Sequence, residues 1–184
     1  MACFILKPIL WNTSGYVRPS GVKAAGFPAD WGFGHEEWNN SPRLELTDAN
    51  GRFRVFHTEG VGRAPVDENA GQTFVFMYAS HDRVQQLVGI AGSVISLAAE
   101  EHKARRDDLF SRLSLESLWL DAWKLPSVRD LNSKEIVQQH WRKEGYWIAN
   151  WLCPSEIFYW LDVPVTLDPM QIRQKSRCLS MFSQ

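Results

Sequence analysis

The sequence predicts one α/β domain of the α+β kind, in which a β-sheet is packed against helices. Its 184 residues fit a single domain that buries a core without disulfides or metals, and 45% of them are hydrophobic. Strand-length apolar runs at 73–78 and 87–94 stand apart from a charged, helix-permissive segment at 98–115. We find no internal repeat or domain boundary, and we assign 1–170 to the domain and 171–184 to an extension or the start of a linker.

The first strands are predicted by apolar runs and by turn residues. Residues 4–10 are apolar apart from Lys7 and run into a turn-prone polar stretch at 11–16, which is typical of a strand followed by a loop. Residues 52–58 alternate well enough for a half-exposed strand. The preceding Asp-Ala-Asn-Gly at 48–51 favours a hairpin turn.

Three later segments complete the predicted sheet. The near-continuous apolar runs at 73–78 and 87–94 are separated by Ser-His-Asp-Arg, which indicates an antiparallel pair. Residues 118–125 form a short, largely apolar run that ends at Pro126. We therefore expect one further strand there.

The remaining segments are predicted to be helices and one structured loop. Charges surround few apolar positions at 98–115, which is typical of a solvated helix. A second helix is expected at 133–143, and another at 155–160 after Pro154. Residues 19–42 are rich in glycine, proline, asparagine and aromatic residues; because flexible linkers lack aromatic residues, we expect an ordered loop.

Composition excludes several classes of protein. The chain has 20 basic and 21 acidic residues and a formal net charge of −1, so any nucleic-acid surface must be local. Cys3, Cys153 and Cys178 are far apart and form no CxxC pair, which argues against a disulfide framework and a zinc site. No signal-like start or long apolar run is present, so we expect a cytoplasmic protein without membrane contact.

No convincing catalytic or metal motif is present. Residues 35–39 begin like the HExxH zinc-protease signature, but position 39 is asparagine and the flanking glycines favour a loop. Asp67 with Glu101 and Lys103 faintly matches a metal-dependent nuclease, yet the latter two fall in the solvated helix. Neither a GxSxG elbow nor a GxxxxGK phosphate loop occurs. We predict a binding protein with no catalytic residue, metal or cofactor.

Two loops, 11–16 and 27–40, combine aromatic with polar side chains. Their aromatic rings can stack on a flat ligand, and a carboxylate can accept a hydrogen bond from the exocyclic amine of cytosine. The alternative, that these aromatic residues pin a long loop to the core, stays open. The candidate base-binding residues are Trp11, Asn12, Ser14, Trp31, Phe33, His35, Glu36, Glu37, Trp38, Asn39 and Tyr78.

The order of segments resembles the PUA-like superfamily, and within it the EVE and YTH domains. The resemblance rests on the opening Phe-Ile-Leu-Lys strand, the loop with Trp and Asn, the strand pair 71–78 and 87–92, and the Leu-Trp-Leu-Asp-Ala-Trp-Lys-Leu-Pro run at 118–126. It implies a small curved β-barrel flanked by helices that binds a flipped or single-stranded modified base in an aromatic cage. Bacterial relatives are sensor domains of modification-dependent restriction enzymes, fused to an HNH nuclease or a McrB-type GTPase.

The resemblance also suggests the walls of the cage. Trp11 falls where the first cage aromatic residue of the YTH relatives lies. Their further cage tryptophans follow the strand equivalent to 87–94, where this chain has the charged segment 98–115 without a tryptophan. Trp31, Phe33 or Trp38 would then form that wall.

We therefore expect a reader of 5-methylcytosine or its hydroxymethyl derivative in DNA, which flips the base out of the duplex. Alternatives are an RNA-binding version of the fold, an enzyme in which His35, Glu36 and Glu37 converge with Asp67, or a structural module. The last would leave Trp11 and Trp38 buried with no pocket between them. The candidate phosphate-binding residues are Arg18, Lys23, Arg43, Arg52, Arg54, Arg105 and Arg106.

Overall fold

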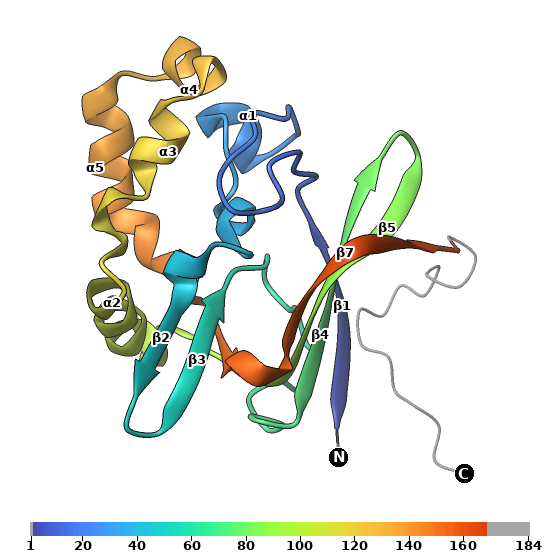
Figure 1. Cartoon of the computed structure of the whole chain (residues 1–184). Coiled ribbons are helices and arrows are strands. Elements are labelled where there is room, and N and C mark those ends of the chain that lie inside the picture. Colours follow the sequence, from blue (N-terminus) through green and yellow to red (C-terminus); the bar gives the residue numbers. More distant parts are fainter. Residues whose placement is uncertain (1, 169–184) are drawn as a thin grey trace.

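The computed structural model describes residues 2–168, which form a mixed α+β fold with a seven-stranded sheet and five helices (Figure 1). The strands run in the order β1-β4-β5-β6-β3-β2, and β7 pairs with β5. They are β1 (Cys3–Ile9), β2 (Glu45–Asp48), β3 (Gly51–Phe56), β4 (Thr73–His81), β5 (Val84–Ser96), β6 (Trp151–Pro154) and β7 (Phe158–Leu167).

The long strand β5 forks the sheet. Its first part, Gln85 to Ala91, pairs with β7, whereas Ile95 and Ser96 pair with β6. The ends of the strand path are β1 and β2, which pair with β4 and β3 and not with each other. The sheet is thus not closed into a barrel, which corrects the curved β-barrel expected from the resemblance.

Most predicted strands are confirmed. The opening strand is β1, which lies parallel to β4. The turn at 48–51 joins β2 to β3 as an antiparallel hairpin. The two apolar runs form β4 and β5, joined by Asp82 and Arg83, which both have positive φ angles (48° and 64°). Such angles give the tight turn whose twist matches that of the flanking antiparallel strands.

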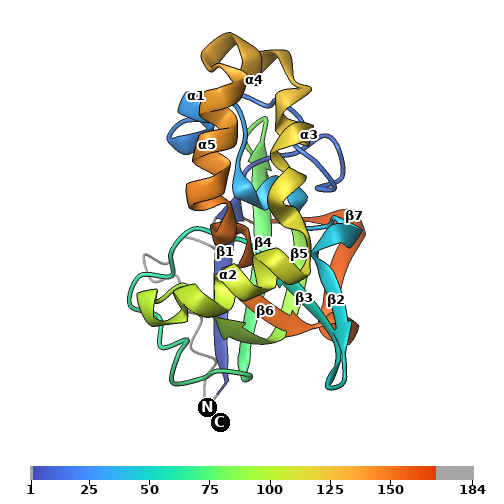
Figure 2. The same cartoon turned by 90° about the vertical axis from the view of Figure 1, so that its left-hand side faces the viewer.

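The helices gather on one side of the sheet (Figures 1 and 2). They are α1 (Phe27–Trp31), α2 (Lys103–Arg112), α3 (Trp119–Trp123), α4 (Pro126–Leu131) and α5 (Lys134–Glu144). The helices predicted at 98–115 and 133–143 are confirmed as α2 and α5. Ser133 caps α5, since its hydroxyl oxygen accepts a hydrogen bond from the amide of Ile136. No helix within residues 2–168 is long and apolar enough to cross a membrane.

Two local predictions are wrong. The strand expected at 118–125 is the helix α3, because a short apolar run has no period that separates the two structures. The helix expected at 155–160 is one 3₁₀ turn (Ser155–Ile157) that leads into β7, whose first residues pair with β5. The HExxH-like stretch was expected to be a loop and not an α-helix, and it is a single 3₁₀ turn, His35–Trp38.

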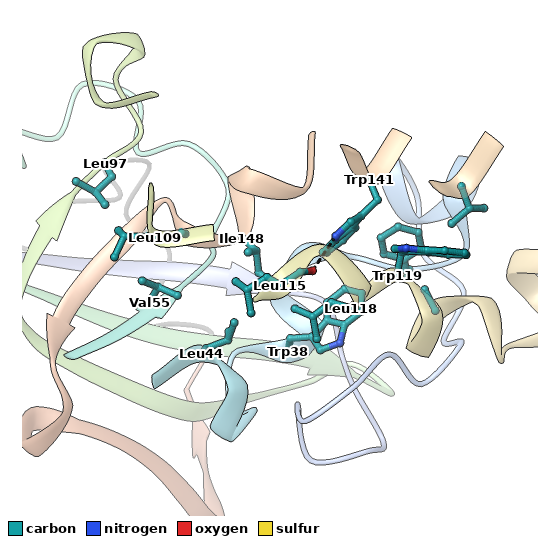
Figure 3. Close-up of a cluster of buried hydrophobic side chains, with 14 of the residues drawn as sticks. Trp38, Leu44, Val55, Leu97, Leu109, Leu115, Leu118, Trp119, Trp141 and Ile148 are labelled. Carbon is teal, nitrogen blue, oxygen red and sulfur yellow. Dashed lines mark hydrogen bonds between the residues drawn. The ribbon is translucent and has the colours of Figure 1, made fainter. Parts of the chain in front are cut away.

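The core has two parts. One lies between the helices and the sheet, and the other consists mainly of residues from the strands β1, β4 and β5. Figure 3 shows the first part, where Trp38 lies near Leu44, Leu115 and Leu118. Trp141 of α5 belongs to this cluster, and its indole nitrogen donates a hydrogen bond to the carbonyl oxygen of Leu115 at 3.0 Å. Trp141 also contacts Phe33 and Trp38, and Val55 of β3 and Leu152 of β6 belong to the same cluster, so the helical layer packs on the segment 33–38 and on the sheet.

Candidate functional site

A solvent-open cavity of about 680 Å³ lies where α1, the His35–Trp38 turn, the segment after β3 and the C-terminal end of α5 meet. This volume lies within the range of small-ligand sites, about 300 to 1,000 Å³. Its lining residues are Phe27, Pro28, Trp31, Gly34, His35, Glu36, His57, Thr58, Glu59, Gly60, Ala98, His140, Glu144, Trp147 and Asn150. We call it the aromatic cavity.

The short helix α1 supplies one wall of the aromatic cavity. It begins at Phe27 with a proline in its first turn and ends at Gly32, whose left-handed φ of 78° closes the helix. A Cβ atom at Gly32 would lie 3.0 Å from Val128 of α4, so glycine also permits close packing there. As a result Trp31 stacks on His140 of α5, with ring centroids 3.7 Å apart and planes 22° apart.

Trp147 lines the aromatic cavity from the turn after α5. Its indole nitrogen donates a hydrogen bond to Glu144 Oε2 at 3.1 Å, and the guanidinium of Arg106 lies 4.2 Å from its ring centroid. Its carbonyl oxygen lies 2.7 Å from His57 Nδ1. Because a carbonyl only accepts hydrogen bonds, His57 carries a proton on Nδ1. In the neutral ring, His57 Nε2 is then an acceptor.

Two histidines of the aromatic cavity have buried Nε2 atoms that make no hydrogen bond with any described residue: His35 and His140. The side chain of His35 is only 8% exposed. Burial lowers the pKa of His35 well below 6.5, and the neighbouring His57 and His140 lower it further. Burial also lowers the pKa of His140, although Glu144 opposes the shift. Both imidazoles are therefore held in the neutral form at the edge of the cavity, with their Nε2 atoms enclosed by the protein.

We expect the protein to lose stability as the pH falls below 6.5. In the unfolded chain His35 takes up a proton near its ordinary pKa of 6.5, whereas in the folded protein its pKa lies lower. The unfolded state therefore binds more protons in that window, and the free energy of unfolding falls on acidification. Thermal melting between pH 7.5 and 5.5 measures the slope. His35→Gln is expected to flatten this slope. An equal slope in the wild type and in His35→Gln would contradict the lowered pKa of His35. His81→Gln replaces an exposed histidine and serves as the control.

Glu37 is a structural residue and has no exposed surface. Its Oε1 accepts hydrogen bonds from Asn12 Nδ2 and from the amide and hydroxyl of Ser20, and its Oε2 accepts one from the amide of Gly34. Burial raises the pKa of Glu37, and these four hydrogen bonds oppose the shift. Asn12 Oδ1 in turn accepts hydrogen bonds from the backbone amides of Ser14 and Tyr16. Glu37 and Asn12 thus hold the loop after β1 against the His35–Trp38 turn.

Glu36, unlike Glu37, lines the aromatic cavity. Its Oε1 accepts a hydrogen bond from the amide of Leu10 at 3.0 Å. Its Oε2 lies against Gly34, where a Cβ atom would stand only 2.7 Å away. Glycine at position 34 therefore makes room for this carboxylate at the cavity wall.

The structure brings Trp31, His35 and Glu36 of the predicted site together, but not its other aromatic residues. Phe33 and Trp38 have no exposed surface and belong to the core, which corrects their assignment to a cage wall. Trp11 stacks on His81 instead, with ring centroids 4.9 Å apart. The cause is register: β1 and β4 are parallel with Ile9 opposite Ala79, so the residues that follow both strands meet.

Other predicted polar contacts also have different positions. Asn39 is buried and exchanges two hydrogen bonds with the backbone of His57. Tyr78 is half-buried on β4 opposite Leu87, and neither it nor Ser14 lines the aromatic cavity. Asp67 is exposed and does not line the aromatic cavity, so it does not meet His35 and Glu36 as the enzyme alternative requires.

The predicted phosphate contacts divide by exposure. Arg54 and Arg106 are buried and donate hydrogen bonds to backbone carbonyl oxygens, which corrects their assignment to phosphate binding. Arg52 is exposed but forms an ion pair with Glu45, with Nη2 2.6 Å from Oε1. Arg43 is also exposed and donates a hydrogen bond to the hydroxyl of Ser117. The other three predicted phosphate-binding residues, Arg18, Lys23 and Arg105, are exposed.

Sequence reasoning missed the residues that complete the aromatic cavity from distant segments. In the sequence, His57 and His140 look like ordinary surface or core histidines, and no motif marks Glu144, Trp147 or Asn150. His140 and Glu144 are four residues apart on α5, so they share a face of that helix. That spacing was the one local signal available for them.

Within residues 2–168, no group of three or more His, Cys, Asp or Glu side chains is arranged to hold a metal ion. Comparison with known proteins finds no matching family model, curated protein or solved structure. The resemblance to PUA-like proteins thus rests on the sequence features alone.

Proposed function

We propose that this chain binds nucleic acid and takes one extruded, modified base into the aromatic cavity, as a PUA-like reader of the EVE/YTH kind. The observation that carries the proposal is the combination of aromatic side chains with three histidines and Glu36 in the lining of a cavity of ligand size. A flat heterocycle with a polar edge satisfies both features at once.

Stacking supplies the first part of the binding energy. Phe27 and Trp31 of α1 line the aromatic cavity, and Trp147 lines it from the turn after α5. One face of the Trp31 ring is already stacked on His140. Base–aromatic stacking contributes about 1 to 3 kcal/mol per base. Extruding a base from a duplex costs a few kcal/mol, so stacking together with hydrogen bonds to the base edge can offset that cost.

The charges of the lining favour a base over a phosphate. Glu36, Glu59 and Glu144 line the aromatic cavity, whereas no lysine or arginine is among its lining residues. Carboxylates repel phosphate, so the sugar–phosphate backbone would stay outside while the uncharged base enters. The exposed Arg18, Lys23 and Arg105 are available for phosphate contacts, which make affinity fall as salt rises.

The first ligands to test are 5-methylcytosine and 5-hydroxymethylcytosine in DNA, in keeping with a sensor role in a restriction or defence protein. A fused nuclease or GTPase domain belongs to the same proposal. RNA carrying a modified base is the alternative partner, and matched DNA and RNA oligonucleotides separate the two.

Trp31→Ala is expected to weaken binding to a duplex with one 5-methylcytosine by about 1 to 3 kcal/mol, because a stacking face is lost. Fluorescence anisotropy at several salt concentrations measures the affinity, and thermal melting checks that the fold is intact. Tyr159→Ala is the matched control, since Tyr159 is an exposed aromatic residue of β7 outside the cavity. Equal affinities of the Trp31→Ala and wild-type proteins, or equal affinity of the wild type for modified and unmodified duplexes, would contradict the proposal.

A further inference from the structure

The two oxygens of Glu36 have separate environments. Oε1 is committed to the structure, because it accepts the hydrogen bond of the Leu10 amide. Oε2 lies against Gly34, which lines the aromatic cavity together with Glu36. The carboxylate is thus held in one orientation, with a hydrogen-bond acceptor at the cavity wall.

A second acceptor comes from His57. Its Nδ1 is used on the carbonyl oxygen of Trp147, so Nε2 of the neutral ring accepts hydrogen bonds. His57 and Glu36 both line the aromatic cavity. A ligand edge that carries hydrogen-bond donors matches this wall.

We propose that the aromatic cavity selects bases that carry an exocyclic amine and rejects their keto counterparts, with Glu36 Oε2 as the acceptor of the amine proton. This inference rests on the proposed function and adds the substrate class and the residue that determines it. The class comprises 4-aminopyrimidines such as cytosine derivatives; thymine and uracil derivatives are excluded.

The discrimination follows from the chemistry of the two edges. In 5-methylcytosine the group at C4 is an amine that donates to the carboxylate, whereas thymine has a carbonyl oxygen at C4 and the same methyl group at C5. That oxygen would face Oε2 with no proton between them, and both acceptors would lose their hydrogen bonds to water. The two bases have nearly the same shape and stacking surface, so the contrast isolates the hydrogen bond.

The test uses single-stranded oligonucleotides that are identical except for one central position, which is 5-methylcytosine, thymine or abasic. Single strands remove the cost of breaking a base pair. We expect the wild-type protein to bind the 5-methylcytosine strand at least about tenfold more tightly than the thymine strand. In Glu36→Gln the amide oxygen keeps the Leu10 hydrogen bond, so the amide nitrogen replaces Oε2 and donates to a keto group. The preference should then fall to near unity or reverse.

Two further variants complete the experiment. Glu101→Gln removes one exposed carboxylate outside the cavity, and it should keep the wild-type preference. Gly34→Ala keeps the carboxylate but places a methyl carbon only 2.7 Å from Oε2, so the carboxylate must shift and the preference should fall as in Glu36→Gln. The φ angle of Gly34 is −119°, so alanine adopts this backbone without strain.

The outcomes separate this inference from the proposed function. Equal affinity of the wild type for the 5-methylcytosine and thymine strands, with both above the abasic strand, overturns the selection of amines while base binding stands. A wild-type preference that Glu36→Gln and Gly34→Ala leave unchanged overturns the role of Glu36. Equal affinity for all three strands overturns the proposed function itself.

Discussion

Trp38→Ala is expected to lower the free energy of unfolding by about 3 to 5 kcal/mol, the cost of truncating a fully buried tryptophan. Trp38 has no exposed surface and packs edge-to-face on Phe33, with ring centroids 5.8 Å apart, and against Trp141 at 5.4 Å. Leu44 and Leu118 lie in the same cluster (Figure 3). Urea denaturation followed by circular dichroism measures the loss.

Two controls define this prediction. Trp38→Phe keeps most of the buried surface, and no described residue pairs with the indole nitrogen of Trp38, so a much smaller loss is expected. Trp11→Ala removes a half-buried ring that stacks on an exposed histidine, and its cost should also be smaller. A Trp38→Ala protein as stable as the wild type would show that Trp38 is not a core residue.

The strands with strong alternation or continuous apolar runs were predictable from the sequence, because such patterns are local. The run at 73–78 consists mostly of aromatic and β-branched residues, which favour a strand. The Asp-Ala-Asn-Gly turn at 48–51 specifies the hairpin of β2 and β3. The segment 118–125 was not predictable in the same way. Its two tryptophans suit a strand, whereas its three leucines and Ala122 are good helix formers, and packing of Leu118, Trp119 and Ala122 into the helical layer selects the helix.

The candidate site was predictable only in part. The loop 27–40 was identified by its mixture of aromatic and polar residues, and it supplies Trp31, His35 and Glu36. Which of its rings face a ligand depends on contacts with distant residues, such as the stack of Trp31 on His140. His57 and Trp147 are 90 residues apart in sequence and meet through one hydrogen bond, which no local pattern indicates.

Neighbouring arginines on α2 illustrate the same limit. Arg105 and Arg106 look alike in sequence, yet Arg105 is exposed and Arg106 has no exposed surface. One nitrogen of Arg106, Nη1, donates hydrogen bonds to the carbonyl oxygens of Leu97 and Ala99. The guanidinium also lies behind the ring of Trp147. Arg106 therefore supports a wall of the aromatic cavity from within the protein.

Arg106→Met is expected to lower the free energy of unfolding by about 3 kcal/mol, because two buried carbonyl oxygens lose a charged donor. Since its side chain does not reach solvent, the slope of log affinity for DNA against log salt should stay at the wild-type value. Arg105→Met is the matched control: its stability should change by less than about 0.5 kcal/mol, and a phosphate contact there would reduce the salt slope by about 1. Thermal melting and salt titrations measure both variants. A reduced salt slope in Arg106→Met, with stability unchanged, would restore Arg106 to the DNA-binding surface and remove it from the support of Trp147.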